Sequence, residues 1–155
     1  MNRTVGVLLV DDERAFVEVL AKRLASKGFE VAWAGKGSEA LSLFSAKSGI
    51  DVVVLDLAMP GMDGLETLKK IKEIDPLVEI IMLTGHATVD SAVDAIKRGA
   101  FEYLMKPCPH QELMALIMKA VNRKRAREAK ILDITMKPYL PEEEKNALIE
   151  QVLAE

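Results

Sequence analysis

Cysteine is almost absent from this chain of 155 residues, in which Cys108 is the only one. A single cysteine cannot form a disulfide within the chain, but the 50% of residues that are hydrophobic are ample for one buried core. Because no second thiol is present, we expect Cys108 to be inert and the protein to be cytoplasmic.

Long hydrophobic runs and an excess of one charge are also missing. The N-terminus has one arginine before an apolar run of six residues, 5–10, which is too short for a signal peptide or a membrane span. The 21 basic and 24 acidic residues leave a net charge of −3, which gives no general attraction to nucleic acid or anionic lipid. We therefore expect no membrane segment and no direct nucleic-acid contact.

The chain does contain five short apolar or β-branched segments. They are residues 5–10, 29–34, 51–56, 79–84 and 100–105. Such runs, apolar at successive positions, are typical of parallel strands that helices cover on both faces. Five strand–helix units are too few for an eight-unit barrel, so the sequence predicts an α/β fold with an open, doubly wound parallel sheet.

Apolar residues at helical spacing separate these segments. Residues 89–96 and 113–121 carry apolar side chains at intervals of three and four, and a thinner stripe after the first segment ends before Gly28. Glycine commonly stops a helix, so a helix is expected to end there.

The character of the chain changes near residue 122. A basic run follows, made of Arg123, Lys124, Arg125 and Arg127. It could contact DNA, or it could be a helix C-terminus whose cations suit the helix dipole, and we favour the second interpretation. Two prolines and a final apolar stripe come next, so we expect one domain over residues 1–126 and a C-terminal extension, 127–155, with one short helix.

Polar side chains stand at the carboxyl ends of four predicted strands. They are Asp11 and Asp12, Asp56, Thr84 and Lys106. In a doubly wound sheet these ends meet along the edge where ligands bind, so the acids should lie close together and repel one another. Mg2+ takes carboxylates, waters and phosphate oxygens as ligands, and an Mg2+ site is therefore predicted, with Lys106 as a second positive charge. Any one of these acids alone could instead be a helix cap.

The same edge lacks the marks of other kinds of site. It has no His and Cys ligands of the kind that bind zinc, and no glycine-rich loop that would hold a nucleotide. A phosphoryl group would then be held by the metal, Lys106 and Thr84. One carboxylate would act as the nucleophile and form an aspartyl phosphate.

Four motifs together carry a resemblance to a known family. The stretches "VLLVDDE", "DVVVLDLAMPGMDG", "EIIMLTGHA" and "GAFEYLMKP" resemble the receiver domain of two-component response regulators, over about residues 4–125. The resemblance implies a flavodoxin-like fold with strand order 2-1-3-4-5 and a receiver domain over residues 1–126.

The resemblance also implies roles for the acids. Asp56 would be the phosphoacceptor that attacks the phosphohistidine of a partner. The protein ligands of Mg2+ would be Asp11, Asp12, Asp56 and the backbone carbonyl of Ala58. Ala58 and His86 stand where the family varies and where side chains can tune dephosphorylation, although for His86 we favour a solvated loop residue without such a role.

The remaining roles concern the phosphoryl group and the switch. Thr84 and Lys106 would bind phosphoryl oxygens, and the Lys106–Pro107 peptide bond is commonly cis in the family. Tyr103 would be the switch aromatic that turns inward when Thr84 moves toward the phosphate. These movements would repack the face formed by the fourth helix, the fifth strand and the fifth helix.

The partners implied are a sensor histidine kinase or phosphotransfer protein, and a downstream protein target. A homodimer through the switch face or through the C-terminal extension is a further option. The stretch "LTGHATVDSAVDAIKRGAFEYLMKP" most resembles receivers of enhancer-binding activators and hybrid kinases, so the chain is either a stand-alone receiver or a fragment of such a protein.

An aspartyl-phosphate phosphatase is the alternative from another class. That class, by resemblance, places its nucleophile after the first strand with a second Asp two residues later. Here Asp56 follows the third predicted strand and position 58 is alanine, so we expect a signalling phosphoacceptor and not an enzyme.

Overall fold

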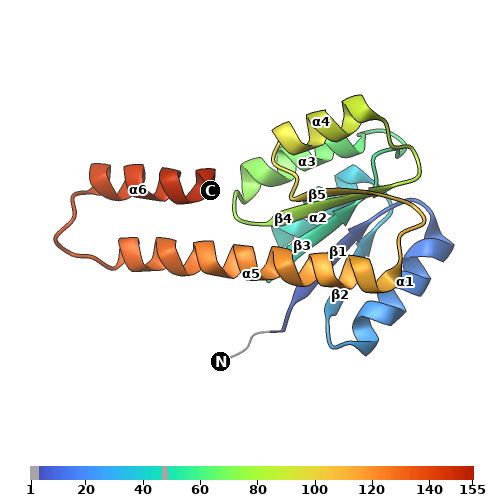
Figure 1. Ribbon diagram of the computed structural model, residues 1–155, viewed down its shortest axis with the longest axis horizontal. Helices are drawn as coiled ribbons and strands as arrows, with labels where there is room; N and C mark the ends of the chain where they lie inside the picture. Colours follow the sequence, from blue (N-terminus) through green and yellow to red (C-terminus); the bar gives the residue numbers. More distant parts are fainter. Residues whose placement is uncertain (1–3, 47–48) are drawn as a thin grey trace.

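The computed structural model describes residues 4–46 and 49–155, and within them a parallel sheet has the strand order β2-β1-β3-β4-β5 (Figure 1). The strands are β1 (Gly6–Val10), β2 (Glu30–Ala34), β3 (Ile50–Leu55), β4 (Glu79–Thr84) and β5 (Glu102–Met105). Neighbouring strands all pair in parallel. The predicted doubly wound sheet and its strand order are confirmed.

The helices cover both faces of the sheet. They are α1 (Arg14–Ser26), α2 (Gly37–Ala46), α3 (Gly64–Ile74), α4 (Val89–Lys97), α5 (His110–Thr135) and α6 (Glu142–Ala154). Leu8 and Val10 of β1 point to a core shared with α2, α3 and α4, whereas Val7 and Leu9 point to a core shared with α1 and α5. This two-sided burial explains the continuous apolar runs of the sequence, since each buried Val or Leu side chain contributes about 1.5–3 kcal/mol.

Helix α4 packs differently from its sequence pattern. The apolar stripe located the helix, but α4 buries only Ala95, while Val89, Val93 and Ile96 are 80%, 47% and 49% exposed. Spacing alone tells that a helix is amphipathic and not which apolar residues a neighbour covers. The apolar face of α4 is therefore largely exposed to solvent.

Helix α5 is much longer than the sequence suggested. It runs 26 residues and passes through the expected boundary at 126/127 without a break. The basic run lies in its interior, so the prediction that these cations mark a helix C-terminus is wrong. Lys124 and Arg127 are buried, and both form ion pairs within the fold. The division into residues 1–126 and 127–155 remains a prediction.

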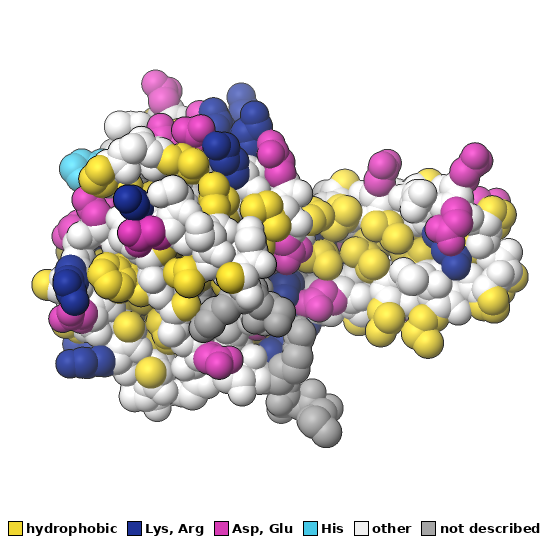
Figure 2. All heavy atoms as spheres, turned by 180° about the vertical axis from the view of Figure 1, so that it is seen from behind, with side chains coloured by type: hydrophobic (Ala, Val, Ile, Leu, Met, Phe, Trp, Pro, Cys, Tyr) yellow, Lys and Arg dark blue, Asp and Glu magenta, His cyan; other side chains and the backbone are white. Residues whose placement is uncertain are grey.

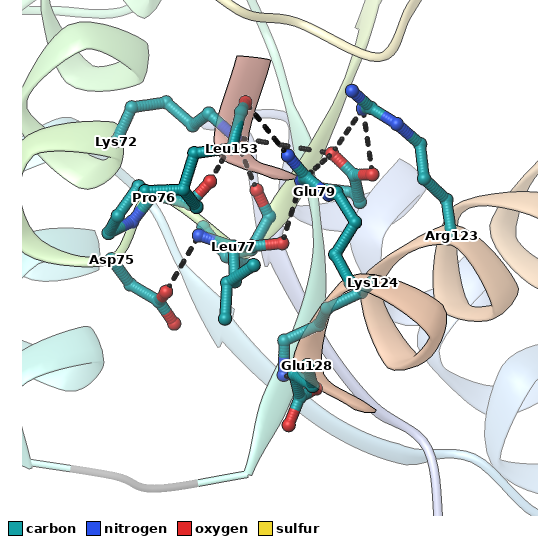
Figure 3. Close-up of polar contacts among 11 residues, drawn as sticks. Lys72, Asp75, Pro76, Leu77, Glu79, Arg123, Lys124, Glu128 and Leu153 are labelled. Atoms are coloured by element: carbon teal, nitrogen blue, oxygen red, sulfur yellow. Dashed lines mark hydrogen bonds and ion pairs between the residues drawn. The ribbon is translucent and has the colours of Figure 1, made fainter. Parts of the chain in front are cut away.

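A buried carboxylate holds the interior of α5 against the sheet (Figure 3). Glu79, the first residue of β4, is fully buried, and Arg123 donates to both of its oxygens at 2.9 and 2.8 Å. Arg127 lies 3.4 Å and Lys72 4.0 Å from the same carboxylate. A buried charge is tolerated only when it is paired, and here cations from α3 and α5 converge on one acid.

The end of α5 and the whole of α6 form a C-terminal arm, defined here as residues 128–155. Helix α6 returns antiparallel beside the end of α5, and the arm extends away from the sheet (Figure 1). Arg127 joins α6 to the loop before β4, because it donates to the carbonyl of Leu153 in α6 at 3.2 Å and to that of Leu77 in the loop at 3.4 Å. Lys130 pairs with Glu155 at 2.8 Å.

The arm exposes hydrophobic side chains (Figure 2). Its exposed apolar residues include Leu132, Met136, Tyr139 and Leu148. Within the arm, Ile134 and Val152 are the buried apolar side chains, and Arg127 contacts the arm through the carbonyl of Leu153.

Candidate functional site

The acids of the predicted edge lie together at the carboxyl ends of β1 and β3. These strands are neighbours, and the backbone N–H of Asp56 donates to the carbonyl of Val10 at 2.9 Å. Carboxylate oxygens of Asp11, Asp12 and Asp56 all lie within 4.8 Å of one another. Asp11 and Asp56 are only 4% and 3% exposed, whereas Asp12 faces solvent.

The turn after β3 leaves this edge open. Gly61 adopts a φ of +78°, which favours glycine, and turns the chain toward α3. Asp63 caps α3 by accepting the N–H of Glu66 at 2.9 Å. At Gly64 a Cβ would collide with the carbonyl oxygen of Asp56, so glycine lets α3 begin directly against the backbone of Asp56.

Lys106 reaches the same pocket from the end of β5. Its ammonium donates to Asp11 Oδ2 at 2.7 Å and to Glu13 Oε1 at 2.9 Å, and it lies 4.3 Å from the centre of the Phe16 ring. The Lys106–Pro107 peptide bond is cis, as the resemblance implied. The structure therefore brings a cation and four acids together.

Burial and Lys106 set the protonation of these groups. Burial raises the pKa of Asp11 above its ordinary value of 3.8, and the nearby charge of Asp56 raises it further. Hydrogen bonds from Lys106 and from the Glu13 N–H lower the pKa of Asp11, but they do not outweigh burial. The hydrogen bond from Lys106 lowers the pKa of Glu13. Burial alone would lower the pKa of Lys106, but the bonds to Asp11 and Glu13 outweigh it and the pKa is raised. Lys106 therefore remains charged at neutral pH.

Asp56 is the member of the cluster whose bonding is incomplete. Its Oδ1 is buried and has no hydrogen-bond partner among the described residues. A buried carboxylate oxygen left unpaired costs free energy, and a bound cation offsets that cost. Three oxygen donors with this much negative charge suit a hard divalent ion, so the residues present fit a metal such as Mg2+.

Thr84 is the last residue of β4, and Tyr103 lies on the neighbouring strand β5. Thr84 is fully buried, and its hydroxyl accepts the backbone N–H of His86 at 3.1 Å. The backbone N–H of Lys106 donates to the carbonyl of Thr84 at 2.9 Å. Tyr103 is half-buried, with its hydroxyl 2.6 Å from that of Ser91 in α4. The side chain of His86 and that of Ala58 are exposed.

Four residues near the site were not found by sequence reasoning. Glu13 follows Asp11 and Asp12 directly and could have been considered with them. The other three, Phe16, Trp33 and Ser91, meet the site only through the fold. Trp33 at the end of β2 donates from Nε1 to the carbonyl of Asp11 at 3.0 Å, so the chain's one tryptophan reports on the acidic pocket.

Comparison with known proteins identifies the family to which this site belongs. Residues 7–118 match the response regulator receiver domain family. The chain belongs to this family. Receivers are signalling phosphoacceptor domains, and this match favours a receiver over the aspartyl-phosphate phosphatase considered above.

Individual relatives agree with the family match. The chain is 40% identical to the DNA-binding transcriptional regulator NtrC of Salmonella typhimurium over 75% of its length, and 36% identical to the transcriptional regulatory protein ZraR of Klebsiella oxytoca over 83%. It spans 24% and 29% of those two proteins. A solved receiver domain from Clostridium thermocellum is 40% identical, with a TM-score of 0.75 over 79% of this chain and 98% of that one.

Two other features concern the cysteine and the helices. Burial raises the pKa of the Cys108 thiol, which favours its unreactive form. Within residues 4–46 and 49–155, no helix is both long and apolar enough to cross a membrane.

Proposed function

We propose that Asp56 accepts a phosphoryl group from the phosphohistidine of a sensor histidine kinase or phosphotransfer protein. A carboxylate oxygen of Asp56 forms a bond to phosphorus while the P–N bond of the donor breaks, and the leaving imidazole keeps the electron pair and takes up a proton. The observation that carries this proposal is the buried, unpartnered Oδ1 of Asp56 beside Asp11 and Asp12.

The charge of the product needs compensation. An aspartyl phosphate carries about 1.5–2 negative charges where the carboxylate carried one, so phosphorylation adds negative charge beside the acid cluster. Mg2+ bound to Asp11, Asp12, Asp56 and the carbonyl of Ala58 would neutralise part of that charge. Lys106 is already in the pocket through Asp11, and it can turn to the phosphoryl oxygens together with the Thr84 hydroxyl. The exposed Ala58 and His86 flank the pocket and tune the access of the water that later hydrolyses the acyl phosphate.

The face formed by α4, β5 and α5 is the proposed output surface. Phosphorylation draws Thr84 toward the phosphate, Tyr103 follows, and this face repacks. The exposed apolar residues there fit a protein partner, which is the downstream target or a second copy of the chain. They are Val89, Val93, Ile96, Met105 and Met118.

Phosphorylation by a small donor tests the assignment of Asp56. Acetyl phosphate with Mg2+ should add one phosphoryl group to the wild type and none to Asp56→Asn, as measured by intact-protein mass spectrometry. Asp63→Asn is the matched control, because Asp63 caps α3 close by but lies outside the cluster, and it should be labelled like the wild type. Wild-type labelling of Asp56→Asn would refute the assignment.

A further inference from the structure

Helix α4 is weakly attached to the rest of the receiver. Nine residues long, it buries only Ala95, and most of its apolar side chains face solvent. With so little hydrophobic burial, the polar contacts at its N-terminus contribute much of what determines its position. The contacts of Ser91 are therefore important.

Ser91 belongs to two hydrogen-bond systems at once. Within α4 it forms the capping box with Thr88: the N–H of Ser91 donates to the Thr88 hydroxyl at 3.0 Å, and the N–H of Thr88 donates to the Ser91 hydroxyl at 3.1 Å. Across to β5, the same hydroxyl lies 2.6 Å from that of Tyr103. Ser91 thus links the start of α4 to the switch aromatic.

The Ser91 hydroxyl has four hydrogen-bonding neighbours, more than it can serve at once. A serine hydroxyl has one proton to donate and two lone pairs that accept. The carbonyl of Thr88 lies 3.0 Å away and can take the Ser91 proton, and the N–H of Thr88 occupies one lone pair. The Thr88 hydroxyl lies 2.9 Å from the Ser91 oxygen and can donate to the second lone pair, so the 2.6 Å bond between Ser91 and Tyr103 can run in either direction.

Both ends of the loop before α4 depend on hydroxyl groups. At its start the N–H of His86 donates to the Thr84 hydroxyl, the group proposed to move toward the phosphate. At its end Thr88 caps α4 and shares Ser91 with Tyr103. A shift of Thr84 that displaces the loop or Tyr103 must therefore break or stretch the bond between Ser91 and Tyr103.

We propose that Ser91 is a positioning residue that holds Tyr103 and the start of α4 in the unphosphorylated arrangement. This inference rests on the proposed function of Asp56, Thr84 and Tyr103. If the bond exists only in the unphosphorylated arrangement, its loss favours the phosphorylated one, and a ligand that binds the latter binds more tightly.

Binding of beryllium fluoride with Mg2+ measures this preference, since its complex with a carboxylate mimics an acyl phosphate. Trp33 fluorescence reports the midpoint, because Trp33 is bonded to the carbonyl of Asp11. Ser91→Ala and Tyr103→Phe should each bind about two- to tenfold more tightly than the wild type, the range that one hydrogen bond supplies. Ser91→Thr, which keeps the hydroxyl, should bind like the wild type.

A double-mutant cycle separates this role from helix capping. Tyr103→Phe leaves the capping box intact, so if both variants break the same bond, Ser91→Ala/Tyr103→Phe should bind no more tightly than either single variant. The control cycle pairs Ser91→Ala with Tyr139→Phe on the exposed arm, where effects should be independent.

Three results would overturn the inference while leaving the phosphoacceptor in place. They are unchanged binding in Ser91→Ala, unchanged binding in Tyr103→Phe, and a double variant whose effect is the product of the two single effects. A wild type that does not respond to Mg2+ and beryllium fluoride would instead contradict the proposed function, and this inference with it.

Discussion

Asp11, Asp12 and Asp56 repel one another, because their oxygens lie within 4.8 Å and two of the three side chains are buried. Close like charges cost free energy, and an ion that binds only the folded protein stabilises it. We expect millimolar Mg2+ to raise the melting temperature of the wild type at neutral pH, measured by differential scanning fluorimetry. Mg2+ should raise the melting temperature of Asp56→Asn less than that of the wild type. Equal rises in the two proteins would contradict a metal site at Asp56.

The same stabilisation should depend on pH. The metal needs deprotonated carboxylates, and burial raises the pKa of Asp11 above 3.8. As pH falls through this raised pKa, protons compete with Mg2+, so the gain in melting temperature should disappear at a pH above the ordinary value for aspartate. Melting curves with and without Mg2+ between neutral pH and about pH 4 measure this, and a gain that persists at the acidic end would argue against carboxylate ligands.

The acids could be predicted at this scale because their positions follow from the topology. Parallel strands place their carboxyl ends on one edge, so Asp11, Asp56 and Lys106 come together whatever the details of packing. The pairing of Lys106 with Glu13 and Phe16 could not be foreseen, because it depends on where α1 begins relative to β5. The same holds for Ser91 and Tyr103, which are twelve residues apart and meet only when α4 packs beside β5.

The carboxylate of Glu79 in β4 is the shared ion-pair partner of two arginines of α5. Glu79→Gln would leave the cations of Arg123 and Arg127 without their shared partner, and breaking a buried ion pair costs about 3–5 kcal/mol. Urea unfolding should show a loss of that order. Glu66→Gln is the matched control, since Glu66 pairs with Lys70 on the surface, where such pairs contribute about 0–1 kcal/mol. Similar losses in the two variants would mean that the Glu79 cluster contributes little.

Strand positions were predictable and helix packing was not. The apolar run predicted the observed bounds of β4, 79–84, because a strand buried on both faces is apolar at successive positions. The exposed face of α4 and the length of α5 depend on long-range contacts. Within α5, Arg123 and Arg127 of the basic run pair with Glu79, which lies 44 residues before Arg123, and Lys124 pairs with Asp51.

At the scale of the whole molecule, the C-terminal arm and the acidic pocket lie at opposite ends of the sheet. Glu79 opens β4 at the end where the arm is anchored, and Thr84 closes it at the pocket. A chain ending at Lys137 loses α6 but keeps Arg123 and Arg127. Acetyl phosphate should label it at the wild-type rate, and a large loss of labelling in a truncated chain with native circular dichroism would show that the arm supports the pocket.

The same truncation distinguishes two modes of self-association. If the chain forms a homodimer through the exposed apolar residues of the arm, light scattering should show a lower mass after α6 is removed. If it associates through the face of α4, β5 and α5, the mass per chain should be unchanged. Ile96→Glu on that face is then the variant expected to dissociate the dimer, since Ile96 is half exposed and points away from the core.

The most direct test of Asp56 as the phosphoacceptor is to locate the phosphoryl group on the chain. After reaction with acetyl phosphate and Mg2+, borohydride converts an aspartyl phosphate to homoserine, and peptide mass spectrometry identifies the converted residue. We predict homoserine at Asp56 alone, and only when Mg2+ was present during labelling. Homoserine at Asp11 or Asp12, or conversion of Asp56 that does not depend on the metal, would contradict it.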